Sequence, residues 1–227
     1  MTLEKIKDRI HPKLYESLYK EGIKELRPAQ RKSIEAGLLE GKNLLVCTPT
    51  ASGKTLVAEL AMLNNLLSNP EKKAVYIVPL KALASEKFRQ FKKKYGDMIK
   101  IALSIGDLDS NDSYLSNYDI IICTSEKFDS LIRHKAPWLS FVSVVIIDEI
   151  HLLNDPGRGP TLEILITILR DKIKNLQLIG LSATIGNPEE LADWLEAELI
   201  IDKWRPVKLS KGIFIDKRIE FVKEKEE

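Results

Sequence analysis

Cysteine is scarce in this sequence, and long hydrophobic runs are missing. Cys47 and Cys123 are the two cysteines among 227 residues, and both lie in apolar runs. Two cysteines cannot form a disulfide framework, so we expect small core residues in a reducing compartment. No run reaches the ~18 apolar residues that span a bilayer, and residues 1–10 are too charged for a signal peptide. These absences predict a cytoplasmic protein without a membrane partner.

An excess of charge of one sign is also missing. The 35 basic and 33 acidic residues leave a net charge of +2, which does not indicate a globally basic nucleic-acid binder. A local basic face remains open. The 11 glycines and 10 prolines exclude collagen-like and low-complexity chains. With 44% hydrophobic and 30% charged residues the chain can bury a core, which excludes wholesale disorder.

Short apolar runs alternate with longer segments of helical pattern. Seven runs predict β-strands, at residues 43–47, 74–78, 99–104, 119–123, 142–147, 176–181 and 199–201. Five segments between them predict helices, at residues 54–67, 80–95, 126–133, 161–173 and 188–196. This alternation predicts an α/β fold, with a doubly wound, mostly parallel sheet and helices on both faces. Such sheets bind ligands at the carboxyl ends of their strands.

The pattern divides the chain into three parts. Residues 1–40 are helical in pattern and precede the first predicted strand, whereas residues 41–205 hold all seven strands. Residues 206–227 contain strand-like stretches at 212–215 and 218–222 and end in a run of Lys and Glu. We expect an N-terminal helical segment, one α/β domain, and a connector that leaves this domain.

A candidate phosphate-binding loop follows the first predicted strand. Residues 48–55 read Thr-Pro-Thr-Ala-Ser-Gly-Lys-Thr and lead directly into a predicted helix. A turn from strand to helix points backbone N–H groups at one spot, where the helix dipole favours a phosphate. Lys54 can reach the β- and γ-phosphates of a nucleotide, and the Thr55 hydroxyl can ligate Mg²⁺. The loop begins with Thr48 where the strict Walker pattern has glycine, so the strand and the helix around it carry the assignment. The residues predicted to bind the nucleotide here are Thr48, Thr50, Ala51, Ser52, Gly53, Lys54 and Thr55.

Two acids end a second apolar strand. Residues 144–147 are Val-Val-Ile-Ile, and Asp148 and Glu149 follow at once. Buried strands rarely end in paired carboxylates without a charge partner. Asp148 can hold Mg²⁺ through water, and Glu149 can take a proton from the water that attacks the γ-phosphate, or orient that water. Solvated acids at an ordinary strand end are the alternative, and the loop at Lys54 argues against it. We expect Lys54, Asp148 and Glu149 to be the catalytic residues.

These motifs resemble those of superfamily 2 helicases. Asp148–His151 match the DExH form of the Walker B motif, and Ser182-Ala183-Thr184 resembles the third helicase motif. The loop at 48–55 has the form of that superfamily, which accounts for the missing first glycine. Residues 26–30, with Gln30, resemble the Q motif. Residues 79–86 and 124–127 resemble motifs Ia and Ib, and Gly106-Asp107 matches a small motif between them.

A finer resemblance is to the archaeal Hjm-type DNA repair helicases. These are relatives of the Ski-two-like RNA helicases and of the helicase half of polymerase theta. The strings that carry this resemblance are residues 126–131, 158–163, 182–188 and 204–207. The resemblance implies the first RecA-like motor domain of a P-loop NTPase. It also implies ATP and Mg²⁺ as cofactors, single-stranded or forked DNA as partner, and a monomer associated with the nucleoid.

The resemblance also assigns roles to individual residues. Gln30 would select adenine, and Mg²⁺ would lie between Thr55 and Asp148. Residues that would couple the nucleotide to the DNA side are His151, Ser182 and Thr184. Residues that would hold the backbone of the tracking strand are Lys81, Gly106, Asp107, Thr124 and Lys127. Lys87, in the same region, is a further candidate contact, and for Lys81, Lys87 and Lys127 a solvated helix charge stays open as the alternative.

Three other functions remain open. The arginine-finger motif of the second RecA-like domain does not occur in the sequence. The chain in isolation could therefore be a nucleotide- and DNA-binding fragment without turnover of its own, because that arginine is worth ~10³–10⁵ in rate. An RNA helicase of the Ski-two-like group is a second alternative. A P-loop switch or kinase-like enzyme is a third, against which Ser182-Ala183-Thr184 argues.

Overall fold

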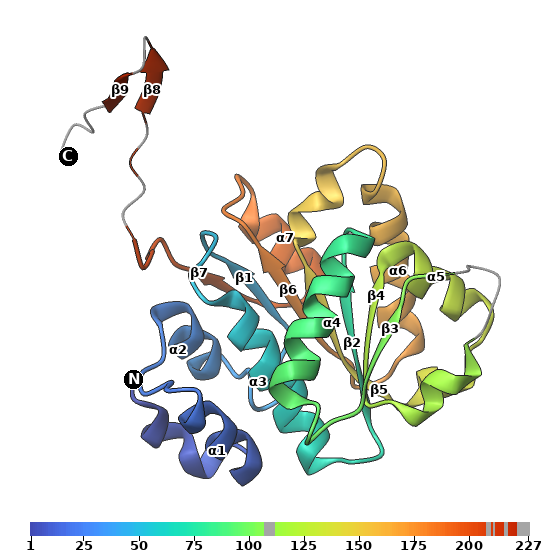
Figure 1. Cartoon of the computed structure of the whole chain (residues 1–227). Coiled ribbons are helices and arrows are strands. Elements are labelled where there is room, and N and C mark those ends of the chain that lie inside the picture. The colour runs from blue at the N-terminus through green and yellow to red at the C-terminus, as the bar shows by residue number, and fades with distance from the viewer. Residues whose placement is uncertain (107–111, 208–209, 211, 216–217, 222–227) are drawn as a thin grey trace.

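The centre of the molecule is a seven-stranded sheet in which all the paired strands are parallel (Figure 1). The computed structural model describes residues 1–106, 112–207, 210, 212–215 and 218–221. The strand order is β3-β4-β2-β5-β6-β1-β7. The strands are β1 Leu44–Cys47, β2 Lys73–Val78, β3 Ile101–Ser104, β4 Ile120–Thr124, β5 Val142–Asp148, β6 Gln177–Ser182 and β7 Glu198–Ile201. The predicted doubly wound α/β fold is confirmed.

Helices cover both faces of this sheet, and two core clusters lie between the sheet and the helices. The α-helices are α1 Pro12–Lys20, α2 Pro28–Glu35, α3 Lys54–Ser68, α4 Lys81–Tyr95, α5 Ser125–Arg133, α6 Gly159–Lys172 and α7 Pro188–Leu195. The 3₁₀ helices are η1 Leu3–Arg9, η2 Ser113–Asn117, η3 Pro137–Phe141 and η4 Ile150–Asn154. Because successive strand residues point to opposite faces, Leu44 and Val46 join the cluster under α1–α4, whereas Leu45 and Cys47 join the cluster under α5–α7. Burial on both sides explains the continuous apolar runs in the sequence.

The predicted helices and strands are all present, and their bounds shift by two residues at most. Residues 1–40 pack onto the α/β core: Leu3, Ile6, Leu14 and Leu18 are buried in the same cluster as α3. The segment is therefore packed against the first helix of the sheet domain. None of the helices in the described ranges is both long and apolar enough to cross a bilayer.

The carboxyl ends of β1, β6 and β5 lie side by side. In the sheet register, Cys47 pairs with Ser182 and Leu181 pairs with Asp148. The loop at 48–55 follows β1 and the acids at 148–149 end β5, about 100 residues later in the sequence. In the sheet, β6 lies between β1 and β5. The topology thus brings three predicted motifs to one edge of the sheet.

The last described segment is a two-stranded antiparallel hairpin. It consists of β8 Gly212–Ile215 and β9 Arg218–Phe221, and in Figure 1 it stands away from the sheet. Its described apolar side chains are exposed, including Phe214 at 70% and Phe221 at 63%. The two strand-like stretches predicted for the connector therefore pair with each other.

Candidate functional site

The loop at 48–55 bends through two left-handed residues. Ala51 has φ +66° and Gly53 has φ +97°, and α3 begins at the next residue, Lys54. The Thr48 and Ser52 hydroxyl groups are buried and hydrogen-bonded to each other at 2.7 Å, whereas Thr50 is exposed. A loop of this shape, before a helix N-terminus, can turn backbone N–H groups toward an anion.

Gln30 fastens this loop to the N-terminus of α2. Its Oε1 accepts from the backbone N–H of Arg27 at 2.8 Å, and its Nε2 donates to the carbonyl of Gly53 at 3.0 Å. Arg27 Nη1 donates to the carbonyl of Ala51 at 2.7 Å. Gln30 is only 3% exposed, so in the structure its amide supports the loop. Its predicted contact with adenine stays a prediction.

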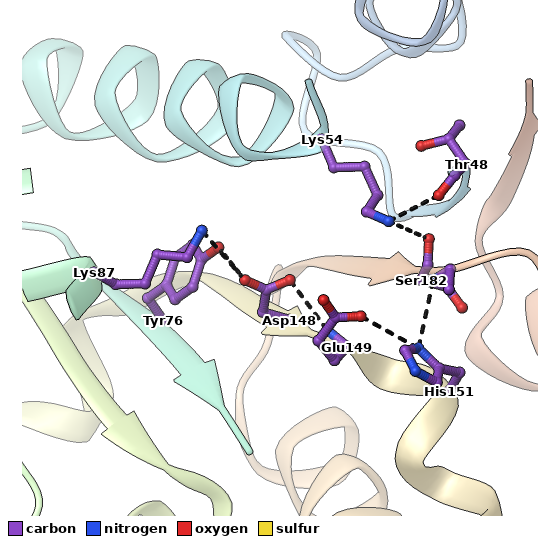
Figure 2. A network of polar contacts seen from close by, with 9 residues as sticks. Thr48, Lys54, Tyr76, Lys87, Asp148, Glu149, His151 and Ser182 are labelled. Carbon is purple, nitrogen blue, oxygen red and sulfur yellow. Dashed lines mark hydrogen bonds and ion pairs between the residues drawn. The ribbon is translucent and has the colours of Figure 1, made fainter. Parts of the chain in front are cut away.

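Lys54 joins the ends of two strands. Its ammonium donates to the carbonyls of Thr48 and Ser182 at 2.8 and 2.9 Å, as Figure 2 shows. Burial lowers the pKa of Lys54, and the nearby carboxylates of Glu149 and Asp148 act in the opposite direction. A lysine ammonium has three donors, and two of them serve these carbonyls. The Lys54 ammonium thus lies at the carboxyl ends of β1 and β6, where the charges of Glu149 and Asp148 act on it.

Asp148 meets a tyrosine and a lysine from outside its own strand. The hydroxyl of Tyr76, on β2, donates to Asp148 Oδ2 at 2.7 Å. Lys87 Nζ, on α4, lies 3.5 Å from the same oxygen (Figure 2). The same ammonium donates to Thr55 Oγ1 at 3.1 Å. Burial, then the charge and the hydrogen bond of Asp148, raise the pKa of Tyr76, so its hydroxyl remains a donor. The Thr55 hydroxyl and the Asp148 carboxylate therefore face the same point, and the Lys87 ammonium lies there in this structure.

These donors fit a magnesium ion. The Thr55 hydroxyl and the Asp148 carboxylate are the oxygen ligands that Mg²⁺ prefers, and the Lys87 ammonium bridging them demonstrates that this point attracts positive charge. Within the described ranges, His, Cys, Asp and Glu form no group of three or more that could hold a metal.

Glu149 connects the acidic strand end to the next motif. It has a left-handed backbone with φ +55°, which is strained for a residue other than glycine. Its Oε2 lies 3.4 Å from His151 Nδ1 (Figure 2). The backbone N–H of Ala183 donates to the same nitrogen at 3.4 Å. His151 and Ser182 thus join the site, whereas Thr184 is exposed beyond the end of β6.

The predicted nucleic-acid residues lie at the ends of other strands. Lys81 is exposed at the start of α4, after β2, and Gly106 is exposed after β3. Thr124 ends β4, is 5% exposed, and accepts from the backbone N–H of Lys127 as the N-cap of α5. Asp107 lies outside the described residues.

The structure differs from the prediction at Lys127. We expected its ammonium to face a phosphate backbone, but the residue is 2% exposed and forms an ion pair with Asp112 at 3.1 Å. Buried charges are retained only when they are paired, which is the arrangement here. Lys127 therefore serves the packing of α5 in this structure, whereas the contact of Thr124 with DNA stays a prediction.

Sequence reasoning missed Arg27 and Tyr76, and it considered Lys87 only as a contact for the DNA backbone, not as a neighbour of Thr55 and Asp148. Their contacts depend on the packing of α2, β2 and α4, which no local pattern specifies. A weak signal existed for Tyr76, because it is a polar aromatic within the apolar run of β2, and a buried tyrosine hydroxyl usually has a partner.

Comparison with known proteins places these features in a family. The DEAD/DEAH box helicase family matches residues 27–191. A relative named "ATP-dependent DNA helicase Hel308", from Methanocaldococcus jannaschii, is 58% identical over 216 residues, which cover 92% of this chain and 18% of that protein. The protein of the same name from Pyrococcus abyssi is 56% identical over 205 residues, covering 90% of this chain and 28% of that protein. The chain thus spans less than a third of the length of either relative.

A solved structure agrees with this. The DUF1998 helicase MrfA bound to DNA and AMPPNP has a TM-score of 0.74 and 27% sequence identity, covering 86% of this chain and 29% of that one. The family match covers most of the chain, and it includes the loop at 48–55, the acids at 148–149 and Ser182-Ala183-Thr184. The chain belongs to the DEAD/DEAH box helicase family.

Proposed function

We propose that this chain is the ATP-binding motor domain of an ATP-dependent DNA helicase. Binding and hydrolysis of ATP with Mg²⁺ would drive movement along single-stranded DNA and unwinding of duplexes, in repair and recombination at stalled forks. One observation carries the proposal: Lys54, Thr55, Asp148 and Glu149 converge at the adjacent ends of β1, β6 and β5. Relatives named as DNA helicases support DNA as the partner.

Each residue has a part in this chemistry. Lys54 would neutralise the β- and γ-phosphates, and the loop N–H groups would orient them. Thr55 and Asp148 would hold Mg²⁺, which when bound neutralises charge on the phosphate oxygens. Glu149 would accept the proton of the attacking water. The contacts from Glu149 to His151 and from His151 to Ala183 give a route by which the nucleotide can influence Ser182 and Thr184.

The remaining parts of the proposal concern partners. A second RecA-like domain would supply the arginines of the opposite wall, so we expect the 227-residue chain alone to hydrolyse ATP slowly and not to unwind DNA. Lys81, Gly106 and Thr124 mark the strand ends where the DNA backbone would lie. The monomeric state and the cytoplasmic, nucleoid-associated location stay predictions.

The experiment is a comparison of Glu149→Gln with the unchanged sequence, in a protein where this chain is joined to its second motor domain. The amide keeps the shape of the side chain but cannot take a proton. ATP and Mg²⁺ should therefore bind as before, while turnover stimulated by single-stranded DNA falls about 100-fold or more. Glu35→Gln, an exposed acid of α2, is the matched control.

Near-normal turnover in Glu149→Gln would refute the assignment of the base. Stimulation by poly-U as strong as by poly-dT would favour the RNA helicase alternative. No stimulation by either polymer would favour an NTPase without a nucleic-acid partner.

A further inference from the structure

Lys87 lies at the point where the proposed metal ligands meet. Its ammonium is 3.1 Å from Thr55 Oγ1 and 3.5 Å from Asp148 Oδ2, and its side chain is 16% exposed. The ammonium also lies 5.6 Å from the centre of the Tyr76 ring. Lys87 thus links the first turn of α3 to the end of β5, although it belongs to α4.

We propose that Lys87 is a built-in counterion that competes with Mg²⁺ for Thr55 and Asp148. The inference rests on the proposed function, because it assumes that these two oxygens serve a metal. Lys87 pairs with them whenever Mg²⁺ is not bound, and it withdraws when Mg²⁺ arrives with the nucleotide.

Geometry and charge support competition. Mg²⁺ binds oxygen at about 2.0–2.1 Å and demands a near-octahedral shell. An ion at that distance from Thr55 Oγ1 and near Asp148 Oδ2 would share its ligands with an ammonium within 3.5 Å of both oxygens. Two cations so close repel each other in a partly buried site. Tyr76 differs in this respect, because its neutral hydroxyl can keep its bond to Asp148 while the metal is present.

The exchange reaches beyond the nucleotide. Lys87 lies in the second turn of α4, which begins at Lys81, a candidate contact for the DNA backbone. Release of Lys87 removes the polar contacts that join this helix to Thr55 and Asp148. Loss of these contacts frees the N-terminal half of α4 from the metal site, and by this route Mg²⁺ and nucleotide would change how Lys81 meets DNA.

The test measures metal binding and stability in the 227-residue chain. The variants are Lys87→Met, which keeps an unbranched side chain but removes the charge, and Lys93→Met, which changes an exposed lysine of the same helix and is the control. The readouts are the affinity for Mn²⁺, a probe for Mg²⁺, in the presence of ADP, and the melting temperature in EDTA.

Lys87→Met should bind Mn²⁺ about five- to tenfold more tightly, at the low end of coupling between linked sites. In EDTA it should melt at a lower temperature, because Asp148 then lacks its counterion, and Mn²⁺ with ADP should remove that difference. Lys87→Arg, which keeps the charge, should restore the melting temperature in EDTA. Lys93→Met should match the unchanged chain in both measurements.

Equal or weaker Mn²⁺ binding by Lys87→Met would overturn the proposal, since Lys87 would then be indifferent to the metal or would help to hold it. If Lys87→Met does not fold, Lys87→Gln, which also lacks the charge, decides by the same criterion. Failure of the proposed function would look different, because the unchanged chain would then bind neither ADP nor Mn²⁺.

Discussion

Gly53 is the position where one added carbon should do the most damage to the nucleotide loop. Its φ of +97° lies in the region that favours glycine, and a Cβ there would overlap Gln30 Nε2 and lie 3.0 Å from Arg27 Cδ. The left-handed backbone costs an alanine about 1–2 kcal/mol. Loss of the bond from Gln30 to the Gly53 carbonyl adds about 1 kcal/mol.

We therefore expect Gly53→Ala to lower the free energy of unfolding by about 2–3 kcal/mol. In a chain of this size that is a fall of roughly 5–10 °C in melting temperature. The assays are denaturation in urea and calorimetric titration with ATP and Mg²⁺. Nucleotide affinity should fall as well, because Gln30 and Arg27 must move away from the loop that they hold.

Gly41→Ala is the control that separates strain from collision. Gly41 has φ +82°, and a Cβ added there meets no other atom within 4 Å. Both variants carry a left-handed alanine and the same gain from stiffening the unfolded chain. Gly53→Ala should be the less stable of the two by at least about 1 kcal/mol, and it alone should lose nucleotide affinity. Equal losses of stability with unchanged ATP binding would show that Gln30 and Arg27 do not hold the loop in its binding shape.

Three further predictions concern other side chains. Tyr76→Phe should weaken binding of ATP with Mg²⁺ about tenfold, because Asp148 loses a hydrogen bond to its charged carboxylate. Unchanged affinity in calorimetry would show that Asp148 does not need the hydrogen bond from Tyr76. Partial burial raises the pKa of Asp202, but hydrogen bonds from Lys32 and the backbone of Trp204, with the charges of Lys32 and Arg31, outweigh it and lower the pKa below the ordinary 3.8. The ionised carboxylate therefore contributes its full stabilisation above pH 3.8, and this is lost as the pH falls through the folded-state pKa. The unfolding curves of the unchanged chain and Asp202→Asn should accordingly converge in acid. Lys81→Ala should reduce the slope of log K for DNA binding against log salt concentration by about one. Lys127→Met should instead lower the free energy of unfolding by about 3 kcal/mol, because it removes the buried ion pair with Asp112. The reverse pattern would show that Lys127, not Lys81, contacts DNA.

The parts of the site that lie along one strand, turn or helix were predictable from sequence. The run of β1, the loop at 48–55 and the helix that begins at Lys54 follow one another directly, so each supports the next. Asp148 and Glu149 follow a buried strand in the same way. Because parallel strands end at one edge of a sheet, the two motifs were expected to meet there.

The parts that depend on packing between distant segments were not predictable. The pairing of β2 with β5 brings Tyr76 beside Asp148, and the packing of α4 brings Lys87 to Thr55. The prediction that Lys127 contacts DNA failed for a related reason. The sequence does not show whether a lysine near a helix N-terminus points to solvent or, as Lys127 does, into the protein toward Asp112. Gln30 matches its motif, yet its buried amide contacts follow from the fold of the loop.

Whether the loop at 48–55 binds the phosphates of ATP is best measured by calorimetric titration of ATP and Mg²⁺ into the unchanged chain, Lys54→Ala and Lys93→Ala. Lys54 bonds two carbonyls, so its loss should lower stability by about 1–2 kcal/mol, and folding is checked by circular dichroism. We expect the unchanged chain and Lys93→Ala to bind ATP alike, while Lys54→Ala, still folded, gives no measurable binding. Unchanged ATP affinity in Lys54→Ala would mean that the loop at 48–55 is not the phosphate site.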